Sequence, residues 1–409
     1  MPDSIVTAYE ESDVLDPRTD AVRPSVPPVI KPVDLGPVHV DTPVVLSPMA
    51  GVTNWPFRVI CESYGPDGLY VAEMITARAL VARNPKALRL CHFAPSENIR
   101  SLQLYGVNPA IVEQAAKIVI DENMADHVDL NFGCPVPKVT RRGGGSALPW
   151  KTDLFREIIQ RVVKVCDAAN VPVTAKIRVG IDHEHETFLE AGHIAQEEGC
   201  KAVTLHARTT AEYYGGHSDW SRIGELVEAL DIPVFGNGDI WGANDALAMV
   251  AETGCAGVAI GRGCQGRPWL FADIKNAFAG SDKRVDPTLG DVCRVVERHA
   301  ELLTEFYDGD EQMAVHDLRK HIAWYLKGFP VGGSTRRAFM ECENLEDVRT
   351  EIDKLDPDIR FPERVVDKPR GRVRFAKKVY LPYGWLESRE TTHDERQALF
   401  GDDPMDAGY

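Results

Sequence analysis

The sequence predicts an α/β protein made of a (β/α)8 TIM barrel followed by a small C-terminal helical domain. Eight short apolar, β-rich runs alternate with stretches of helical period over about 240 residues, which is the pattern of eight βα units. From about residue 286 onward only helical patterns follow. A doubly wound open sheet is the alternative, but such sheets usually have fewer strands, and no GxGxxG motif follows the first run.

The barrel is expected at residues 41–285. An irregular acidic arm is expected before it, because residues 1–40 are rich in Pro and Asp and show no sustained period. The eight predicted barrel strands lie at 43–50, 69–76, 101–106, 127–134, 172–180, 202–208, 233–240 and 257–263.

The C-terminal third is expected to differ from the barrel. Residues 286–355 read as a helical domain, with helices near 292–307, 312–326 and 345–355. Residues 356–409 are expected to form a basic, Pro- and Arg-rich segment that ends in an acidic tail.

Composition excludes several classes of protein. With 409 residues and 44% apolar content, the chain can bury one large core and a smaller one. No run approaches the ~18 apolar residues of a membrane span, and the N-terminus does not resemble a signal peptide. The nine cysteines are widely spaced without a CxxC pair, so we expect no metal site and no disulfide framework, as is usual for a cytoplasmic protein.

The net charge of −16 is distributed unevenly along the chain. Residues 1–41 hold eight acidic and three basic side chains, and residues 387–409 hold seven and two. The two ends therefore account for most of the negative charge. The body of the protein is only mildly acidic and can still present a basic face to a nucleic acid.

The most informative stretch is Asn131-Phe132-Gly133-Cys134-Pro135, which ends the fourth predicted strand. Barrel enzymes expose their reactive groups at the carboxyl ends of strands, so Cys134 is placed as a catalytic residue. A thiol with a pKa near ~8.5 is mostly protonated at neutral pH and can donate a proton to a carbon centre. The alternative, that a lone cysteine is a small buried apolar side chain, is disfavoured by the position between Gly and Pro.

Polar side chains and glycines mark the ends of the other predicted strands. Lys176 is the most telling, because a lysine inside a barrel strand must be paired or ligand-bound to offset its desolvation. The alternative is a structural ion pair with Asp129 or Asp239. The further strand-end residues are Ser47, Pro48, Met49, Ala50, Gln103, Arg178, His206, Arg208, Asn237, Gly238, Asp239, Gly261 and Arg262.

Glycine-rich turns follow the last two predicted strands, at 236–239 and 261–263. Barrels commonly bind phosphate at this place, because glycine lets backbone N–H groups approach an anion. Ordinary tight turns are the alternative. The pair of loops favours a phosphate-bearing cofactor at the barrel mouth, and this cofactor would supply the redox or acid–base chemistry.

The motifs in their order resemble the tRNA-dihydrouridine synthases, specifically the bacterial B-type branch. The resemblance covers about residues 43–350. One departure is Asn54, where the family usually has Asp after the Thr. The matching motifs are Ser47–Asn54, Leu102–Gly106, Asn131–Pro135, Lys176–Arg178, His206–Arg208, Asn237–Asp239 and Gly261–Arg262.

This resemblance implies an FMN-containing barrel that reduces the C5=C6 bond of selected tRNA uridines with NADPH. It also implies that Cys134 is the general acid. The positions that match FMN contacts are Pro48, Met49, Ala50, Gln103, Lys176, His206, Asn237, Gly238, Asp239, Gly261 and Arg262.

The partner is expected to be tRNA, held in part by residues 286–355. In the helix near 312–327, Lys320, Trp324 and Lys327 fall opposite the apolar stripe, which suits phosphate contact and base stacking. A solvated face with the tryptophan docked on the barrel is the alternative. The predicted substrate or tRNA contacts are Asn131, Lys138, Arg178, Arg208, Lys320, Trp324 and Lys327.

Two other functions remain open at this stage. A flavin barrel dehydrogenase acting on a free pyrimidine would need neither a helical module nor basic runs. A flavin-stabilised tRNA-binding or folding protein with little turnover would need no acid at position 134.

Overall fold

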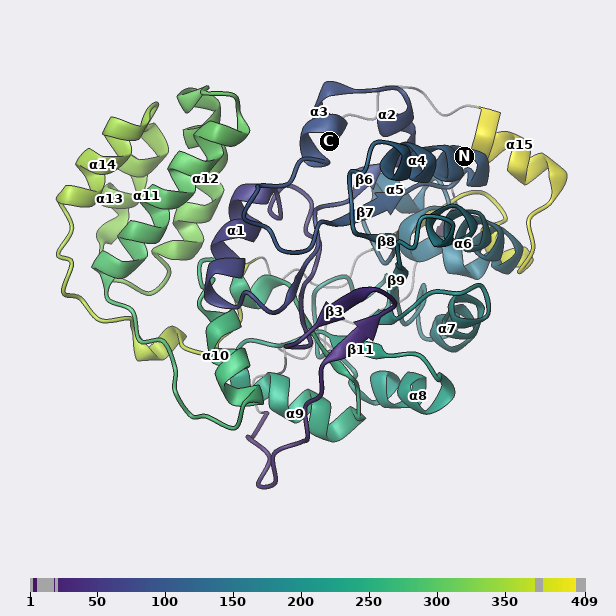
Figure 1. The fold of residues 1–409 in the computed structure, drawn as a ribbon, viewed down its shortest axis with the longest axis horizontal. Coiled ribbons are helices and arrows are strands. Elements are labelled where there is room, and N and C mark those ends of the chain that lie inside the picture. The colour runs from purple at the N-terminus through teal and green to yellow at the C-terminus, as the bar shows by residue number, and fades with distance from the viewer. Residues whose placement is uncertain (1–2, 6–17, 19–20, 372–377, 402–409) are drawn as a thin grey trace.

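The computed structural model describes residues 3–5, 18, 21–371 and 378–401. A barrel of parallel strands forms the centre, and a bundle of helices lies to one side of it (Figure 1). In the part of the chain that is described, no helix is long and apolar enough to cross a membrane.

Within the described residues, nine parallel strands form one sheet. Val71, next to β5, bridges Ser101 at the start of β7, and β6 pairs with the end of β7, so the sheet closes on itself. The second barrel strand is thus split into β5 and β6, and the predicted eight-unit barrel is confirmed. The strands are β4 (Val44–Leu46), β5 (Leu69–Tyr70), β6 (Ile75–Thr76), β7 (Ser101–Tyr105), β8 (His127–Phe132), β9 (Val173–Arg178), β10 (Val203–His206), β11 (Val234–Asn237) and β12 (Gly257–Ile260).

Helices surround this sheet (Figure 1). Asn54, Asn84 and Asn108 cap three of them through their side chains, with proline in the first turn. The helices are α1 (Trp55–Tyr64), α2 (Ala77–Val81), α3 (Pro85–Leu90), α4 (Pro109–Asp121), α5 (Pro137–Thr140), α6 (Thr152–Asp167), α7 (Phe188–Glu197), α8 (Ser221–Ala229), α9 (Ala243–Thr253) and α10 (Leu270–Phe278).

A hairpin closes the amino-terminal end of the barrel. It consists of β2 (Val33–Leu35) and β3 (Val38–Val40), and its buried valines and leucine pack against Val45, Leu69 and Phe235. The range 1–40 was predicted to be irregular, and this prediction does not hold for the hairpin at 33–40 or for the strand β1 (Asp3–Ile5). The two three-residue strands are too short to show a period in the sequence.

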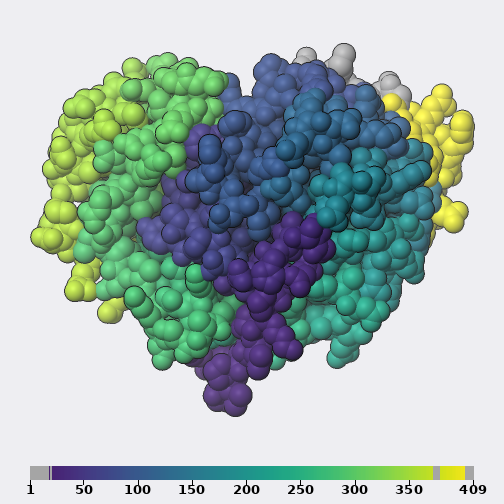
Figure 2. All heavy atoms as spheres, viewed as in Figure 1, coloured from purple at the N-terminus to yellow at the C-terminus, as the bar shows by residue number. Residues whose placement is uncertain are grey.

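The helical domain contains α11 (Leu289–Phe306), α12 (Glu311–Tyr325), α13 (Gly332–Glu341) and α14 (Leu345–Asp353). The apolar stripe of α12 is buried, as the helical period predicts. The domain packs on the barrel through Trp55 and Trp269. Figure 2 shows the surface hollowed between this domain and the segment that carries α2 and α3.

The chain then returns to the opposite side of the barrel. β13 (Val379–Leu381) pairs with β1 (Asp3–Ile5), and α15 (His393–Gly401) lies far from the helical domain (Figure 1). The basic run near 368–378 lies partly outside the described residues. Of its described part, Arg370 is buried and donates to the carbonyl oxygens of Gln265 and Trp324.

Candidate active site

The predicted strand-end residues meet at the carboxyl rim of the barrel. Asn131 of β8 pairs in register with Lys176 of β9, and Arg178 pairs with His206 of β10. His206 in turn pairs with Asn237 of β11. Because the strands are parallel, these side chains share one end of the barrel.

Cys134 follows β8 in a tightly held loop. Of the nine cysteines, all of which are described, Cys134 alone is partly exposed and the other eight are buried. Its backbone N–H donates to Asn131 Oδ1 at 3.1 Å. Burial raises the pKa of the thiol above its ordinary value, although the Val136 N–H and the charges of Arg178 and Lys176 oppose this. The thiol is therefore protonated at neutral pH.

A buried chain of hydrogen bonds orients the amides beside Cys134. Asp129 accepts from Thr174 Oγ1 at 2.6 Å and from Gln103 Nε2 at 2.7 Å. Gln103 Oε1 then accepts from Asn131 Nδ2 at 2.8 Å, so Asn131 Oδ1 faces the backbone N–H groups of Gly133 and Cys134. The orientation of both amides is thus set by one carboxylate.

The same chain of hydrogen bonds continues towards the amino-terminal end of the barrel. The Thr174 hydroxyl donates to Asp129, so it must accept from His127 Nε2, which lies 3.0 Å away. His127 Nδ1 is then free to accept from the Ser101 hydroxyl at 2.7 Å. Burial lowers the pKa of His127 to about 4 and raises that of Asp129 to about 6. His127 is therefore neutral.

Lys176 donates to Asn237 Oδ1 at 3.1 Å. Burial and the neighbouring Arg178 guanidinium lower the pKa of Lys176 to about 8, against the opposing influence of Asp129. Asp129 thus acts on this lysine through its charge, and the hydrogen bond goes to an amide. A partly buried ammonium with a neutral hydrogen-bond partner is suited to an anionic ligand.

Arg178 holds the loop that contains Cys134 through a hydrogen bond to its backbone. It is buried, and it donates to the carbonyl oxygens of Gly133 at 2.9 Å and Thr209 at 2.8 Å. Its guanidinium also lies 5.4 Å from the ring centre of Tyr214. Tyr214, which the sequence reasoning missed, also faces Arg262 at 5.1 Å. Its place after His206 in a Tyr-Tyr-Gly-Gly turn is the signal that could have indicated it.

The loops after β11 and β12 fit a phosphate-bearing group. At the ends of the neighbouring strands β4 and β10, Ser47 Oγ and Arg208 Nη1 are buried without a hydrogen-bond partner among the described residues. A Cβ placed on Gly261 would meet no atom within 4 Å, so its backbone borders open space. Arg262 lies next to it, and burial lowers its pKa to about 10. Unpaired donors, a cation and space are what a phosphate group requires.

Several predicted residues take positions that favour other roles. Arg208 is buried and paired with Asp239 at 2.8 Å, which favours a structural role for both side chains. Trp324 packs against the barrel core, which supports docking over base stacking. Lys327 donates to the carbonyl oxygen of Pro369 at 2.6 Å. Lys320 pairs with Asp317.

The remaining predicted residues lie at the rim. Lys138 is exposed on α5, and the Nζ of Lys320 lies beside Gly51 in the loop after β4. Met49 donates its backbone N–H to Thr53 Oγ1, which fixes the loop that contains Pro48 and Ala50.

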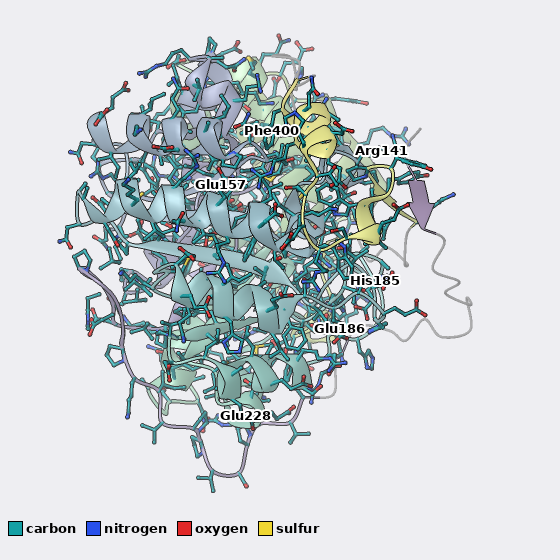
Figure 3. All side chains as sticks on the ribbon, turned by 90° about the vertical axis from the view of Figure 1, so that its right-hand side faces the viewer. Arg141, Glu157, His185, Glu186, Glu228 and Phe400 are labelled. Atoms are coloured by element: carbon teal, nitrogen blue, oxygen red, sulfur yellow. The ribbon has the colours of Figure 1, made fainter. Side chains whose placement is uncertain are left out.

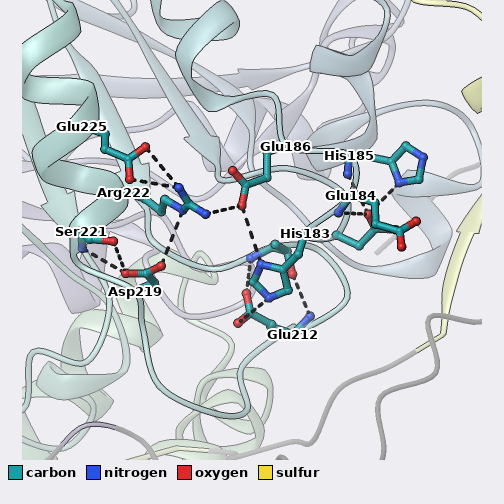
Figure 4. A network of polar contacts seen from close by, with 11 residues as sticks. His183, Glu184, His185, Glu186, Glu212, Asp219, Ser221, Arg222 and Glu225 are labelled. Atoms are coloured by element: carbon teal, nitrogen blue, oxygen red, sulfur yellow. Dashed lines mark hydrogen bonds and ion pairs between the residues drawn. The ribbon is translucent and has the colours of Figure 1, made fainter.

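Ionisable side chains tie two rim loops together (Figure 4). His183, after β9, lies 3.7 Å from Glu186 and 3.6 Å from Glu212, and Glu186 pairs with Arg222 at 3.0 Å. The hydrogen bond to Glu212 raises the pKa of His183. The network fixes the loops after β9 and β10 at the carboxyl ends of these strands.

Comparison with known proteins agrees with this geometry. Residues 45–359 match the family described as Dihydrouridine synthase. A probable tRNA-dihydrouridine synthase of Mycobacterium tuberculosis is 47% identical over 398 residues, which cover 96% of this chain and 99% of the relative. That of Mycobacterium leprae is also 47% identical, over 89% of this chain and all of the relative.

B-type relatives match a shorter part of the chain. tRNA-dihydrouridine synthase B of Pseudomonas putida is 38% identical over 304 residues, which cover 74% of this chain and 88% of the relative. The resemblance drawn from the motifs is confirmed, as is the assignment of the protein as an oxidoreductase. The chain belongs to the dihydrouridine synthase family.

Proposed function

We propose that this protein reduces the C5=C6 bond of selected uridines in tRNA to 5,6-dihydrouridine, with FMN as cofactor, NADPH as reductant and Cys134 as general acid. One observation carries the proposal: the single partly exposed cysteine stands at the end of β8 with a raised pKa. A thiol that is protonated at neutral pH is suited to give a proton to carbon.

The residues at the rim have distinct proposed roles. FMN, when bound, supplies the hydride that adds to C6 of the uracil ring. Cys134 gives its proton to C5, and the positive charges of Lys176 and Arg178 stabilise the resulting thiolate. Because Cys134 is partly exposed, water can reprotonate it.

The cofactor is proposed to lie against the strand ends from β4 to β12. Lys176 and Gln103 would face the flavin ring, flanked by residues 48–50 and by His206, which burial keeps neutral through a strongly lowered pKa. The backbone of residues 237–239, with Gly261 and Arg262, would hold the phosphate. One phosphate site without a dinucleotide motif favours FMN over FAD.

The tRNA is proposed to contact both sides of the mouth. Lys138 is exposed directly after the Cys134 loop, and Lys320 reaches the loop after β4 from the helical domain. Lys327 and Trp324 are already engaged in contacts within the protein, so we expect them to contribute less.

Replacement of Cys134 tests the proposal. Cys134→Ala should retain FMN and the NADPH-driven reduction of the flavin, but lose uridine reduction about 10²–10⁴-fold, the usual contribution of a general acid. Cys134→Ser is the matched control for side-chain size, and its weakly acidic hydroxyl should restore little. If Cys134→Ala modifies tRNA at the parental rate, the thiol is not the acid.

The two alternative functions predict different substrates. NADPH oxidation should be stimulated by unmodified tRNA and not by free uridine. Stimulation by the free base would favour a pyrimidine dehydrogenase, and no stimulation by either would favour a tRNA-binding protein.

A further inference from the structure

The loop that follows Cys134 folds back onto it. Gly145 has φ +55°, and a Cβ placed there would lie 2.4 Å from the carbonyl oxygen of Cys134. That oxygen accepts from both the N–H and the Oγ of Ser146, each at 3.1 Å. The Thr210 hydroxyl holds Ser146 Oγ at 2.7 Å. The position of Cys134 therefore depends on residues 143–147.

The C-terminal strap, which we define as residues 378–401, covers this loop. Trp385 is buried, and its Nε1 donates to the carbonyl oxygen of Ala147 at 3.0 Å. Its ring lies so close to Gly143 that a Cβ there would be 2.5 Å from the indole. Figure 3 shows the strap along this side of the barrel, with Phe400 on α15 and with Arg141, from the segment after α5, lying next to the strap. One indole thus holds both ends of the stretch 143–147.

A buried ammonium shows that the loop and the strap form one unit. The side chain of Lys151 has no exposed surface, and its Nζ donates to Glu395 Oε1 at 2.9 Å and to the carbonyl oxygen of Glu390 at 3.2 Å. Both acceptors belong to the strap. A buried charge without partners is strongly unfavourable, so Lys151 requires the strap. Asp153 adds contacts to Arg396 at 2.9 Å.

The strap lies outside the part that matches the family model, which ends at residue 359. We propose that Trp385 is a positioning residue for Cys134: the indole holds the loop 143–147, and this loop holds the Cys134 carbonyl through Ser146. The proposal rests on the proposed function of Cys134 as the acid. It assigns to the strap a role in the proton-transfer step.

The test compares Trp385→Ala and Trp385→Phe with the control Tyr383→Ala. Phe keeps an aromatic ring against Gly143 but removes the N–H donor. Tyr383 lies in the same strap and is 73% exposed. The first readout is the rate at which iodoacetamide alkylates Cys134 in the purified protein, measured by peptide mass spectrometry. The eight buried cysteines report unfolding in the same sample.

We expect Cys134 to be alkylated at least threefold faster in Trp385→Ala and by an intermediate factor in Trp385→Phe. The kcat of uridine reduction should fall at least tenfold in Trp385→Ala, with KM for tRNA and NADPH-driven flavin reduction within twofold of the parent. Tyr383→Ala should match the parent in all readouts.

Parental alkylation and parental kcat in both Trp385 variants would overturn the proposal. If Trp385→Ala also exposes the buried cysteines, that variant has unfolded and Trp385→Phe becomes the deciding variant. A parental rate of Cys134 alkylation in Trp385→Phe would then overturn the proposal. Failure of the proposed function is distinguishable, because a parent protein without uridine reduction still yields the alkylation comparison.

Discussion

Asn54 joins the barrel to the helical domain. Its Oδ1 accepts from the Phe57 N–H at 3.3 Å and caps α1, so its Nδ2 faces Asp317 Oδ2 of α12 at 3.2 Å. Both side chains are largely buried. An aspartate at this position could still cap the helix but could not donate to Asp317, which gives a physical reason for the departure from the family pattern.

The variant Asn54→Asp should therefore be destabilised through the domain contact alone. Removing a hydrogen bond to a charged group costs about 1.5–3 kcal/mol. Repulsion between two carboxylates about 4 Å apart contributes a further penalty of at most ~4 kcal/mol at an effective dielectric constant of ~20. The ion pair between Lys320 and Asp317 offsets part of this repulsion. We expect a net loss of about 2–4 kcal/mol at pH 8.

The loss should shrink as the pH falls. Repulsion raises the folded-state pKa of one carboxyl above its unfolded value, so protonation relieves the penalty as the pH drops through the raised value. Free energies of unfolding from urea denaturation at pH 8 and pH 5 measure this. The double variant Asn54→Asp/Asp317→Asn restores a donor and an acceptor with their positions exchanged.

A double-mutant cycle with Asp317→Asn then isolates the pair, and we expect a coupling of at least about 2 kcal/mol. The reasoning is refuted if Asn54→Asp is as stable as the parent. It is also refuted if the free energy of unfolding of the double variant falls by the sum of the losses measured for the two single variants.

Three further predictions concern the cofactor, the helical domain and the RNA. Lys176→Met should lower the FMN content of the purified protein, measured by absorbance, because it removes the partly buried ammonium at the barrel mouth; full occupancy contradicts this. Burial lowers the pKa of His299 to about 3, whereas its pKa in the unfolded chain is about 6.5. The folded protein should therefore lose stability as the pH falls from about 6.5 towards 3, by about 2 kcal/mol at pH 5. His299→Gln should reduce this loss in urea titrations, and an unchanged pH dependence would exclude His299 as its source. Replacing Lys138 and Lys320 with Glu should weaken tRNA binding and flatten the log–log salt dependence, by about one unit for each phosphate that the variant no longer binds; a parental slope would place the RNA elsewhere.

The sequence by itself determined the barrel and the candidate acid. Strand and helix periods are local properties, and the eight runs each contain a strand of the sheet. The carboxyl ends of parallel strands necessarily meet, so Cys134 and Lys176 could be assigned to one site before any contact was known. The stripe of α12 was predictable for the same reason, because its period is carried by neighbouring residues.

Only the tertiary structure decided what covers these elements. Periodicity shows that a face is apolar and not which partner it meets, so the docking of Trp324 on the barrel could not be separated from base stacking. The charge of Arg208 gave no sign that Asp239 would neutralise it in the interior. Trp385 lies 238 residues from Ala147 in the chain, and the acidic composition of its surroundings suggested a tail. Such contacts form between segments that are far apart in the chain, and local sequence patterns do not predict which distant segments pack together.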